Sequence, residues 1–283
     1  MKIFSVNLYN YFNIKKSEGA NGELTCYLHS RSKEVNQERV FPAMLIFPGG
    51  GYGYISEREG EPIAIAYMAK DFNTFVLNYS VSPMQYPTQL LEAYMALAYM
   101  RKEREYLQID ENKIAGIGFS AGAHLCALTG NFRNEEVLKK IDYSGNIKPK
   151  AIILAYPVIS VFGGHTGSFE NLCGKDSQLQ QQLSVENLVT EQSSPAFIWS
   201  TNQDKFVPAK NVLLLASAYE KYNIPYSLHI WGRGGHGLSL ADDNVFDTNN
   251  FKVEYITESI REWLPLSVEW LAEQGVAVDD RIQ

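Results

Sequence analysis

A serine flanked by glycines is the first feature of this sequence that could do chemistry. Gly118, Ser120 and Gly122 alternate with Phe119 and Ala121, so the stretch has the form G-x-S-x-G. It follows a short apolar run and precedes small residues suited to a helix, which is the strand–turn–helix context of a nucleophile elbow. Glycines are needed on such a turn because the strand and helix approach too closely for side chains. We therefore predict Ser120 as a nucleophile presented on a sharp turn.

A serine hydroxyl becomes an effective nucleophile when a histidine takes its proton and a carboxylate orients that histidine. Asp204 follows the apolar run at 196–200, and His236 lies in a glycine-rich loop after the run at 226–231. In parallel sheets, catalytic groups gather beyond the carboxyl ends of strands, and the chain order Ser, Asp, His is known for such triads. Taken singly, Asp204 could cap a helix starting near residue 208, and His236 could be a solvated loop residue. Together they predict a catalytic triad with Ser120.

The other four histidines fit this role less well. His29 and His229 lie within strand-like patterns, which predicts packed or surface positions. His165 belongs to an irregular stretch and has no identifiable partner. His124 follows Ser120 by four residues and shares its helical face, but it lies one turn further into the helix. We predict a structural or supporting role for His124.

Acyl transfer to serine creates a negatively charged oxygen that needs N–H donors already in place. Residues 49–51 are three consecutive glycines that end the apolar run at 41–47, and a glycine backbone can approach a substrate without side-chain obstruction. We predict the N–H groups of Gly50, Gly51 and Ala121 as this oxyanion hole; a flexible turn is the alternative reading of the glycines. Tyr52, beside the same loop, either lines the substrate pocket or is simply packed.

The elements that position these residues alternate between strands and helices. Residues 3–14 and 23–29 have the alternation of antiparallel strands. Further strands are predicted at 41–47, 74–80, 151–156, 196–200 and 226–231, besides the run ending at residue 119. Helices are predicted after residue 62 and at 87–106, 208–222 and 256–273, with Pro265 kinking or restarting the last. This alternation predicts an α/β fold with a mostly parallel central sheet and helices on both faces.

Residues 160–194 interrupt this alternation. They are rich in Gly, Ser and Gln and show weak periodicity. We interpret them as an insertion over the strand ends that forms a lid or a pocket wall; a plain surface insertion is the alternative. Because no repeat, low-complexity tract or linker is apparent, residues 1–283 are predicted to form a single domain.

Composition narrows the choice of partners and location. The chain carries 25 basic and 32 acidic residues, a net charge of −7, and no long basic run. This balance argues against nucleic acid or an anionic membrane as the main partner. Cys26, Cys126 and Cys173 are widely spaced and odd in number, which predicts reduced thiols and no zinc site. We see no signal peptide or spanning segment, so the expected location is the cytoplasm.

Several motifs in register resemble the α/β-hydrolase superfamily. More narrowly, the sequence is similar to the bacterial esterase/lipase group that includes acetyl esterases and acetylxylan-type carbohydrate esterases. The matching stretches lie between residues 40 and 240, at 48–52, 58–62, 78–83, 86–87, 118–125, Asp204 and 235–237. Pro48 stands where hormone-sensitive-lipase-like enzymes have a histidine, which favours the carbohydrate-esterase branch. Ala123 stands where relatives often have glycine, a change that a helix tolerates.

The resemblance implies an α/β-hydrolase fold and a serine esterase that hydrolyses short acyl esters, acetyl above all, of acylated sugars or xylo-oligosaccharides. It implies no metal and no organic cofactor. The expected partner is a small-molecule ester, and a homodimer is compatible with the sequence. A broad esterase without a dedicated sugar substrate stays open. Two further alternatives are a prolyl-oligopeptidase-type peptidase, whose usual extra domain does not fit this length, and a non-catalytic binding protein, which commonly lacks a triad residue.

Overall fold

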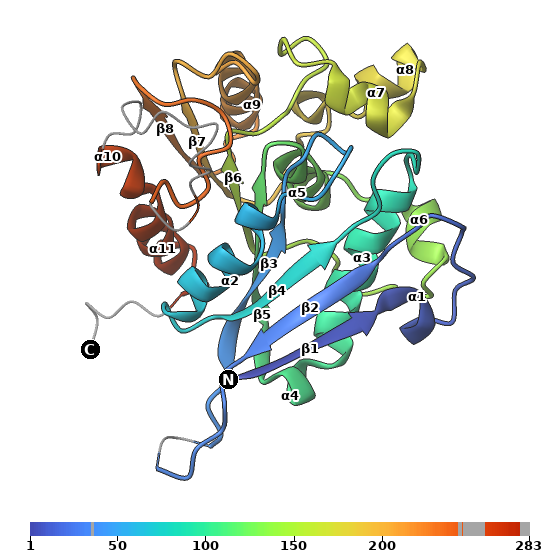
Figure 1. The fold of residues 1–283 in the computed structure, drawn as a ribbon, viewed down its shortest axis with the longest axis vertical. Helices are drawn as coiled ribbons and strands as arrows, with labels where there is room; N and C mark the ends of the chain where they lie inside the picture. Colours follow the sequence, from blue (N-terminus) through green and yellow to red (C-terminus); the bar gives the residue numbers. More distant parts are fainter. Residues whose placement is uncertain (35–36, 243–244, 246–257, 278–283) are drawn as a thin grey trace.

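The computed structural model of the chain is built around a twisted β-sheet with helices on both faces (Figure 1). It describes residues 1–34, 37–242, 245 and 258–277. Within these residues the sheet has eight strands in the order β1-β2-β4-β3-β5-β6-β7-β8. The strands are β1 (Lys2–Asn7), β2 (Glu23–Leu28), β3 (Phe41–Phe47), β4 (Asn73–Asn78), β5 (Ile109–Phe119), β6 (Ala151–Ala155), β7 (Ala196–Thr201) and β8 (Tyr226–Trp231).

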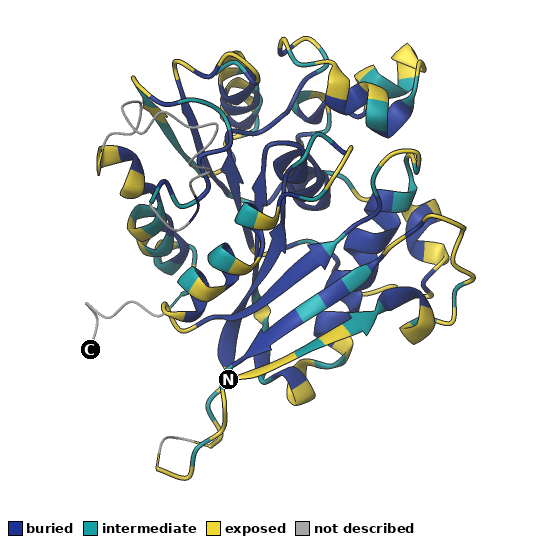
Figure 2. Ribbon diagram, viewed as in Figure 1, coloured by how far each residue is buried: buried dark blue, intermediate teal, exposed yellow. Residues whose placement is uncertain are grey.

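The strand directions follow the predicted pattern. β2 pairs antiparallel with both β1 and β4, whereas all later neighbours are parallel. β3, β6 and β7 are buried along their whole length, as expected for apolar runs covered by helices on both faces. The edge strands β1 and β8 are partly exposed (Figure 2). The parallel strands therefore bring their carboxyl ends to one edge of the sheet.

Two layers of helices cover this sheet. α3, α5 and α9 bury their apolar residues against one face, and α2 and α11 pack against the other. No helix in the described ranges is long and apolar enough to cross a bilayer. The helices are α1 (Leu8–Tyr11), α2 (Glu61–Met68), α3 (Thr88–Lys102), α4 (Arg104–Leu107), α5 (Ala121–Asn131), α6 (Glu135–Lys139), α7 (Gly167–Cys173), α8 (Ser177–Gln182), α9 (Lys210–Lys221), α10 (Glu258–Arg261) and α11 (Trp263–Glu273), with short 3₁₀ turns η1 (Glu57–Glu59) and η2 (Val185–Asn187).

Several predicted boundaries change. The strand predicted at 3–14 ends at Asn7, because the Asn7 side chain accepts the N–H of Asn10 and caps α1. The helix predicted at 87–106 ends at Lys102 and is followed by the separate turn α4. Part of the helix predicted at 256–273 lies outside the described residues. Pro265 lies in the first turn of α11, so the helix restarts there and is not kinked.

Residues 160–194 form α7, α8 and η2 beyond the carboxyl ends of the strands (Figure 1). The side-chain amide of Asn171 donates to the carbonyl of Gly51 at 2.8 Å, so α7 contacts the loop after β3. The Val185 N–H donates to the carbonyl of Ile159 at 2.9 Å. The insertion is thus hydrogen-bonded to the strand-end loops at two separate places.

Candidate active site

Ser120 lies on the turn between β5 and α5. Its backbone has φ 53° and ψ −117°, a conformation that residues with a side chain rarely adopt. The two glycines predicted around it are required by close approach. A Cβ at Gly118 would lie 2.4 Å from the Gly122 carbonyl oxygen, and one at Gly122 would lie 2.1 Å from that of Phe47. The tight turn leaves the Ser120 hydroxyl at the end of the strand, facing the cleft.

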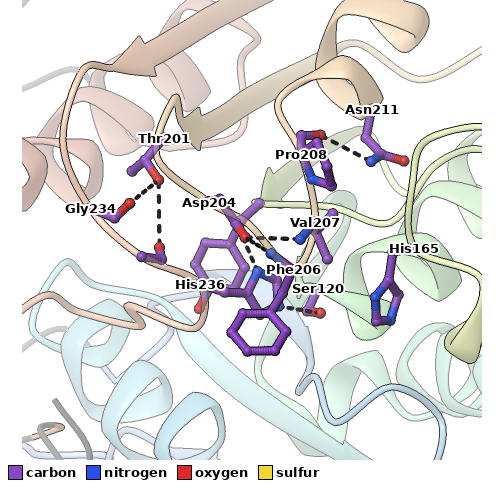
Figure 3. Close-up of polar contacts among 12 residues, drawn as sticks. Ser120, His165, Thr201, Asp204, Phe206, Val207, Pro208, Asn211, Gly234 and His236 are labelled. Atoms are coloured by element: carbon purple, nitrogen blue, oxygen red, sulfur yellow. Dashed lines mark hydrogen bonds and ion pairs between the residues drawn. The ribbon is translucent and has the colours of Figure 1, made fainter.

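The structure brings the three predicted triad residues together (Figure 3). His236 Nε2 lies 2.8 Å from Ser120 Oγ, and His236 Nδ1 lies 2.6 Å from Asp204 Oδ2. An ionised carboxylate only accepts hydrogen bonds, so Nδ1 carries the ring proton and Nε2 is the acceptor. The Ser120 hydroxyl therefore donates to the free lone pair of the imidazole.

Asp204 is held by the loop that follows β7. Its Oδ1 accepts the N–H groups of Phe206 and Val207 at 2.9 and 2.8 Å, and its side chain is fully buried. α9 begins at Lys210 and has Ala209 as its N-cap, so Asp204 does not cap that helix. Asp204 instead closes a turn of its own loop, which fixes the carboxylate that faces the imidazole.

The loop after β8 presents His236. The Thr201 hydroxyl donates to the carbonyl of Gly234 at 2.8 Å, which ties this loop to the end of β7. The ring of Tyr156 packs edge-on against His236 with centroids 5.1 Å apart. The imidazole is one-fifth exposed, so it is supported from behind while its Nε2 side remains open to the cleft.

The loop after β3 has its carbonyl groups occupied. Each carbonyl of residues 48–52 accepts a hydrogen bond, from a side chain at two positions and from a backbone N–H at three. The donors are Tyr79 OH to Pro48 (2.6 Å), Ser56 N to Gly49 (3.0 Å), Gly53 N to Gly50 (2.9 Å), Asn171 Nδ2 to Gly51 (2.8 Å) and Ser82 N to Tyr52 (2.7 Å). No described residue accepts the N–H of Gly50 or Gly51. Such a loop holds two backbone donors in place without giving them an internal partner.

This loop lies directly beside the nucleophile. A Cβ at Gly49 would be 3.1 Å from the Cβ of Ser120. Ala121 is the first residue of α5, so its N–H has no partner within the helix. Gly50 has φ 121°, and a Cβ there would lie 2.0 Å from the carbonyl oxygen of Tyr54. The three predicted donors thus come from two elements that meet at Ser120.

These residues open into a cleft of about 1100 Å³. Its wall includes Gly50, Gly51 and the three triad residues, together with Tyr54, Phe206, His165 and the loop 234–238. Tyr54 and Phe206 are largely exposed, at 65% and 70%. The cleft therefore reaches the surface, where two of its lining side chains are aromatic.

Tyr52 does not line this cleft, so its predicted contact with substrate is wrong. Its side chain is buried, and its hydroxyl lies 2.8 Å from Nδ1 of His124. His124 Nε2 lies 2.8 Å from the carbonyl oxygen of Leu183. Because a carbonyl only accepts, Nε2 carries the proton and Nδ1 accepts from Tyr52. Burial lowers the pKa of His124 to about 4, so the ring is neutral at pH 7 and links the glycine loop to residues 160–194.

His165 was assigned no role from the sequence, yet it lines the cleft wall. Its Nε2 lies 3.1 Å from Ser168 Oγ. Its pKa is lowered, first by burial and then by the neighbouring His236. His165 is flanked in the sequence by Gly163, Gly164 and Gly167. Flanking glycines are also the feature that singled out His236 in the sequence. Across the described part of the chain, no three His, Cys, Asp or Glu side chains are grouped so that they could hold a metal ion.

Comparison with known proteins agrees with this fold. The BD-FAE family model matches residues 31–219. An endo-1,4-beta-xylanase B of Butyrivibrio fibrisolvens is 33% identical over 258 residues, which are 87% of this chain and 39% of that protein. An acetylxylan esterase of Xylanibacter ruminicola is 28% identical over 239 residues, 81% of this chain and 46% of that protein. The chain thus spans less than half the length of these two curated relatives.

Two solved structures match over nearly their whole length. An acetyl ester-xyloside bifunctional hydrolase from Caldicellulosiruptor lactoaceticus is 34% identical with a TM-score of 0.78, covering 90% of this chain and 89% of that one. A carboxylesterase from Lactobacillus plantarum is 28% identical with a TM-score of 0.85, covering 99% of this chain and all of that one. The chain therefore belongs to the BD-FAE family, with the α/β-hydrolase fold, among the carboxylic ester hydrolases.

Proposed function

We propose that this chain is a serine esterase that removes short acyl groups, acetyl above all, from acylated sugars or xylo-oligosaccharides. The observation that carries the proposal is the continuous hydrogen-bonded path from Ser120 Oγ through His236 to Asp204, at 2.8 and 2.6 Å. This hydrogen-bonded path is the one that proton transfer requires, because a proton leaving the serine hydroxyl enters the imidazole at the nitrogen opposite the carboxylate.

In the first half of the reaction, Ser120 Oγ attacks the ester carbonyl carbon while His236 Nε2 takes the hydroxyl proton. The carbonyl oxygen becomes an oxyanion and accepts the N–H groups of Gly50, Gly51 and Ala121. Asp204 stabilises the imidazolium that forms. Fixed donors of this kind stabilise charge that develops only in the transition state, which is how they accelerate the reaction.

In the second half, the tetrahedral intermediate collapses and the alcohol leaves with the proton from His236. The acyl group stays on Ser120 as an ester. A water molecule then gives a proton to His236 and attacks the acyl carbon, and collapse of the second intermediate returns the proton to Ser120. All of these steps use groups of this chain and water.

The open cleft and the relatives support a sugar as the alcohol part. Tyr54 and Phe206 place exposed aromatic surface beside the triad, and such surfaces combine apolar area with defined geometry. One curated relative is an acetylxylan esterase, and one similar structure is an acetyl ester-xyloside hydrolase. Cytoplasmic location, a homodimer, a single domain and a pocket-wall role for residues 160–194 stay predictions alongside this proposal.

Hydrolysis of p-nitrophenyl esters from acetate to octanoate by the wild type and Ser120→Ala tests the reaction class. We expect turnover to fall steeply beyond short chains, and to fall on the order of 10⁴-fold or more in Ser120→Ala. Covalent labelling by diethyl p-nitrophenyl phosphate should add one phosphoryl group at Ser120. The thermal midpoint of Ser120→Ala should match that of the wild type, which separates lost chemistry from lost folding.

Acetylated xylosides and xylo-oligosaccharides then test the substrate class. Release of acetate from them, with higher kcat/KM than from ethyl acetate, would support the sugar. Equal rates would support a broad esterase. Full activity in Ser120→Ala would eliminate the proposed nucleophile, and a wild type without any ester turnover would return the peptidase and binding-protein alternatives.

A further inference from the structure

Glu59 is a buried carboxylate beside the candidate active site. Its side chain is nearly inaccessible, at 3% exposure of the residue. Oε2 accepts the N–H of Gly49 at 2.8 Å, and Oε1 accepts the hydroxyl of Tyr156 at 2.6 Å. Gly49 immediately precedes the proposed oxyanion donors Gly50 and Gly51. One oxygen of Glu59 thus binds the glycine loop, and the other binds the hydroxyl of Tyr156.

Tyr156 continues the connection to the loop that carries His236. Its hydroxyl accepts the N–H of Ser239 at 2.9 Å while donating to Glu59, and its ring packs edge-on against His236. Burial, reinforced by Glu59, raises the pKa of Tyr156 far above its ordinary value. The hydroxyl therefore keeps its proton and remains a donor to the carboxylate.

A second pair of hydrogen bonds joins the turn η1 to the residues that follow His236. The Ser239 hydroxyl donates to the carbonyl of Arg58 at 2.6 Å. The Arg58 guanidinium donates to the carbonyl of Val245 at 3.2 Å. The short turn η1 is therefore hydrogen-bonded on one side to the glycine loop and on the other to the residues that follow His236.

We infer that Glu59 and Tyr156 are positioning residues that hold the oxyanion loop and the His236 loop in a fixed mutual geometry. The two loops follow β3 and β8, which are separated in the sheet by β5, β6 and β7, so strand pairing alone does not join them. Both oxygens of Glu59 accept hydrogen bonds from the protein, so it acts on the reaction through these partners. The inference rests on the proposed esterase function.

The reason such a link matters is that transition-state stabilisation depends on atomic placement. The oxyanion donors must face the same carbonyl that Ser120 attacks, and His236 must face Ser120 and the leaving oxygen at once. A misplacement of about 1 Å can cost on the order of 100-fold in rate. Groups fixed by hydrogen bonds behind the reacting atoms prevent that loss.

Two variants break the link, and one provides a matched control. In Glu59→Gln the amide group can accept with its oxygen alone, so one of the two hydrogen bonds that Glu59 accepts is lost. Tyr156→Phe removes the hydroxyl, and it tests the same link should Glu59→Gln not fold. The control is Tyr67→Phe, because Tyr67 is also fully buried on the same face of the sheet and its hydroxyl pairs with Ser267 at 2.7 Å, away from the cleft.

The measurement is kcat and KM for p-nitrophenyl acetate, normalised to active sites counted by phosphorylation of Ser120. We expect kcat to fall on the order of 10- to 100-fold in Glu59→Gln and in Tyr156→Phe, with KM changed by less than about threefold. Affinity for a trifluoromethyl ketone, which forms a charged hemiketal with Ser120, should fall by the same factor as kcat/KM. The kcat of the double variant should be only slightly lower than that of the less active single variant.

A stability role alone predicts a different pattern. Tyr67→Phe should lower the thermal midpoint and leave kcat per counted site unchanged. The inference is overturned if Glu59→Gln and Tyr156→Phe behave like Tyr67→Phe, or if they raise KM without lowering kcat. If the wild type shows no turnover that depends on Ser120, the proposed function fails, and this inference fails with it.

Discussion

Asp204 binds His236 with one carboxylate oxygen and its own loop with the other. Oδ2 lies 2.6 Å from His236 Nδ1, while Oδ1 accepts the backbone N–H groups of Phe206 and Val207. The loop bonds set the direction of the carboxylate, and the carboxylate sets the tautomer of the imidazole. The two functions are carried by different atoms, so a substitution can separate them.

Asp204→Asn should keep the loop and lose the chemistry. The amide oxygen can still accept from Phe206 and Val207, whereas the amide nitrogen then faces His236 Nδ1 and favours the tautomer that protonates Nε2. We expect kcat for p-nitrophenyl acetate to fall on the order of 10⁴-fold, with the thermal midpoint nearly unchanged. Activity within tenfold of the wild type would show that Asp204 is not the orienting acid.

The structure brings Ser120, Asp204 and His236 together, as the sequence predicted, because the signal for each residue was local. Each residue follows a run that forms a parallel strand, and such strands end at the same edge of the sheet. The glycines around Ser120 add a constraint that few other turns impose. Periodicity and turn composition were therefore enough to place three residues that are far apart in the sequence.

Tyr52, His124 and Glu59 could not be placed in the same way. Tyr52 adjoins the glycine loop in sequence, but its hydroxyl pairs with His124, and His124 in turn bonds Leu183. Those partners come from a later helix and from an irregular insertion, and no local pattern encodes the pairing. The same holds for Glu59, which is buried against a backbone N–H donor and a tyrosine hydroxyl from distant parts of the chain.

Gly50→Ala and Gly51→Ala should differ although the glycines are adjacent. A Cβ at Gly50 would lie 2.0 Å from the Tyr54 carbonyl oxygen, whereas at Gly51 the nearest atom is Ser168 Oγ at 3.8 Å. Gly50→Ala should lower the free energy of unfolding by about 1–3 kcal/mol and displace the loop. Gly51→Ala keeps only the cost of its positive φ of 64°, about 1 kcal/mol.

Urea unfolding and kcat per counted site check this pair. The rate loss should be on the order of 100-fold for Gly50→Ala, comparable to removing an oxyanion donor, and clearly smaller for Gly51→Ala. Equal losses in both variants would mean that backbone strain, and not the collision with Tyr54, controls this loop.

His124 should make stability depend on pH between about 6.5 and 4. Its pKa is about 4 in the folded chain, against an ordinary value of 6.5, because burial disfavours the charged ring. As the pH falls through this window, the unfolded chain takes up a proton before the folded chain does. Its contribution is thus fully present above pH 6.5 and is lost towards pH 4, by about 3 kcal/mol in total.

This contribution of His124 is isolated by measuring the free energy of unfolding at several pH values for the wild type and His124→Gln. Subtracting the two curves removes other groups such as Glu92 and Glu186, whose pKa values burial raises. Tyr52→Phe is the control, because it removes the hydroxyl bonded to His124 and keeps the titrating ring. Identical pH slopes in the wild type and His124→Gln would contradict the buried, neutral histidine.

Phe206→Ala should separate recognition of the alcohol from the chemical step. The Phe206 ring is 70% exposed, lines the cleft and lies 6.3 Å from the His236 ring, while its backbone N–H, which alanine retains, binds Asp204. The free energy of unfolding should change by less than about 0.5 kcal/mol. KM for an acetylated xyloside should rise about fivefold, as expected for a stacking contact worth about 1 kcal/mol, and kcat/KM for ethyl acetate should not change.

Phe162→Ala is the control, because Phe162 is 61% exposed and lies outside the cleft wall. A Phe206→Ala variant with unaltered KM for the xyloside would show that the rim aromatic does not contact the sugar.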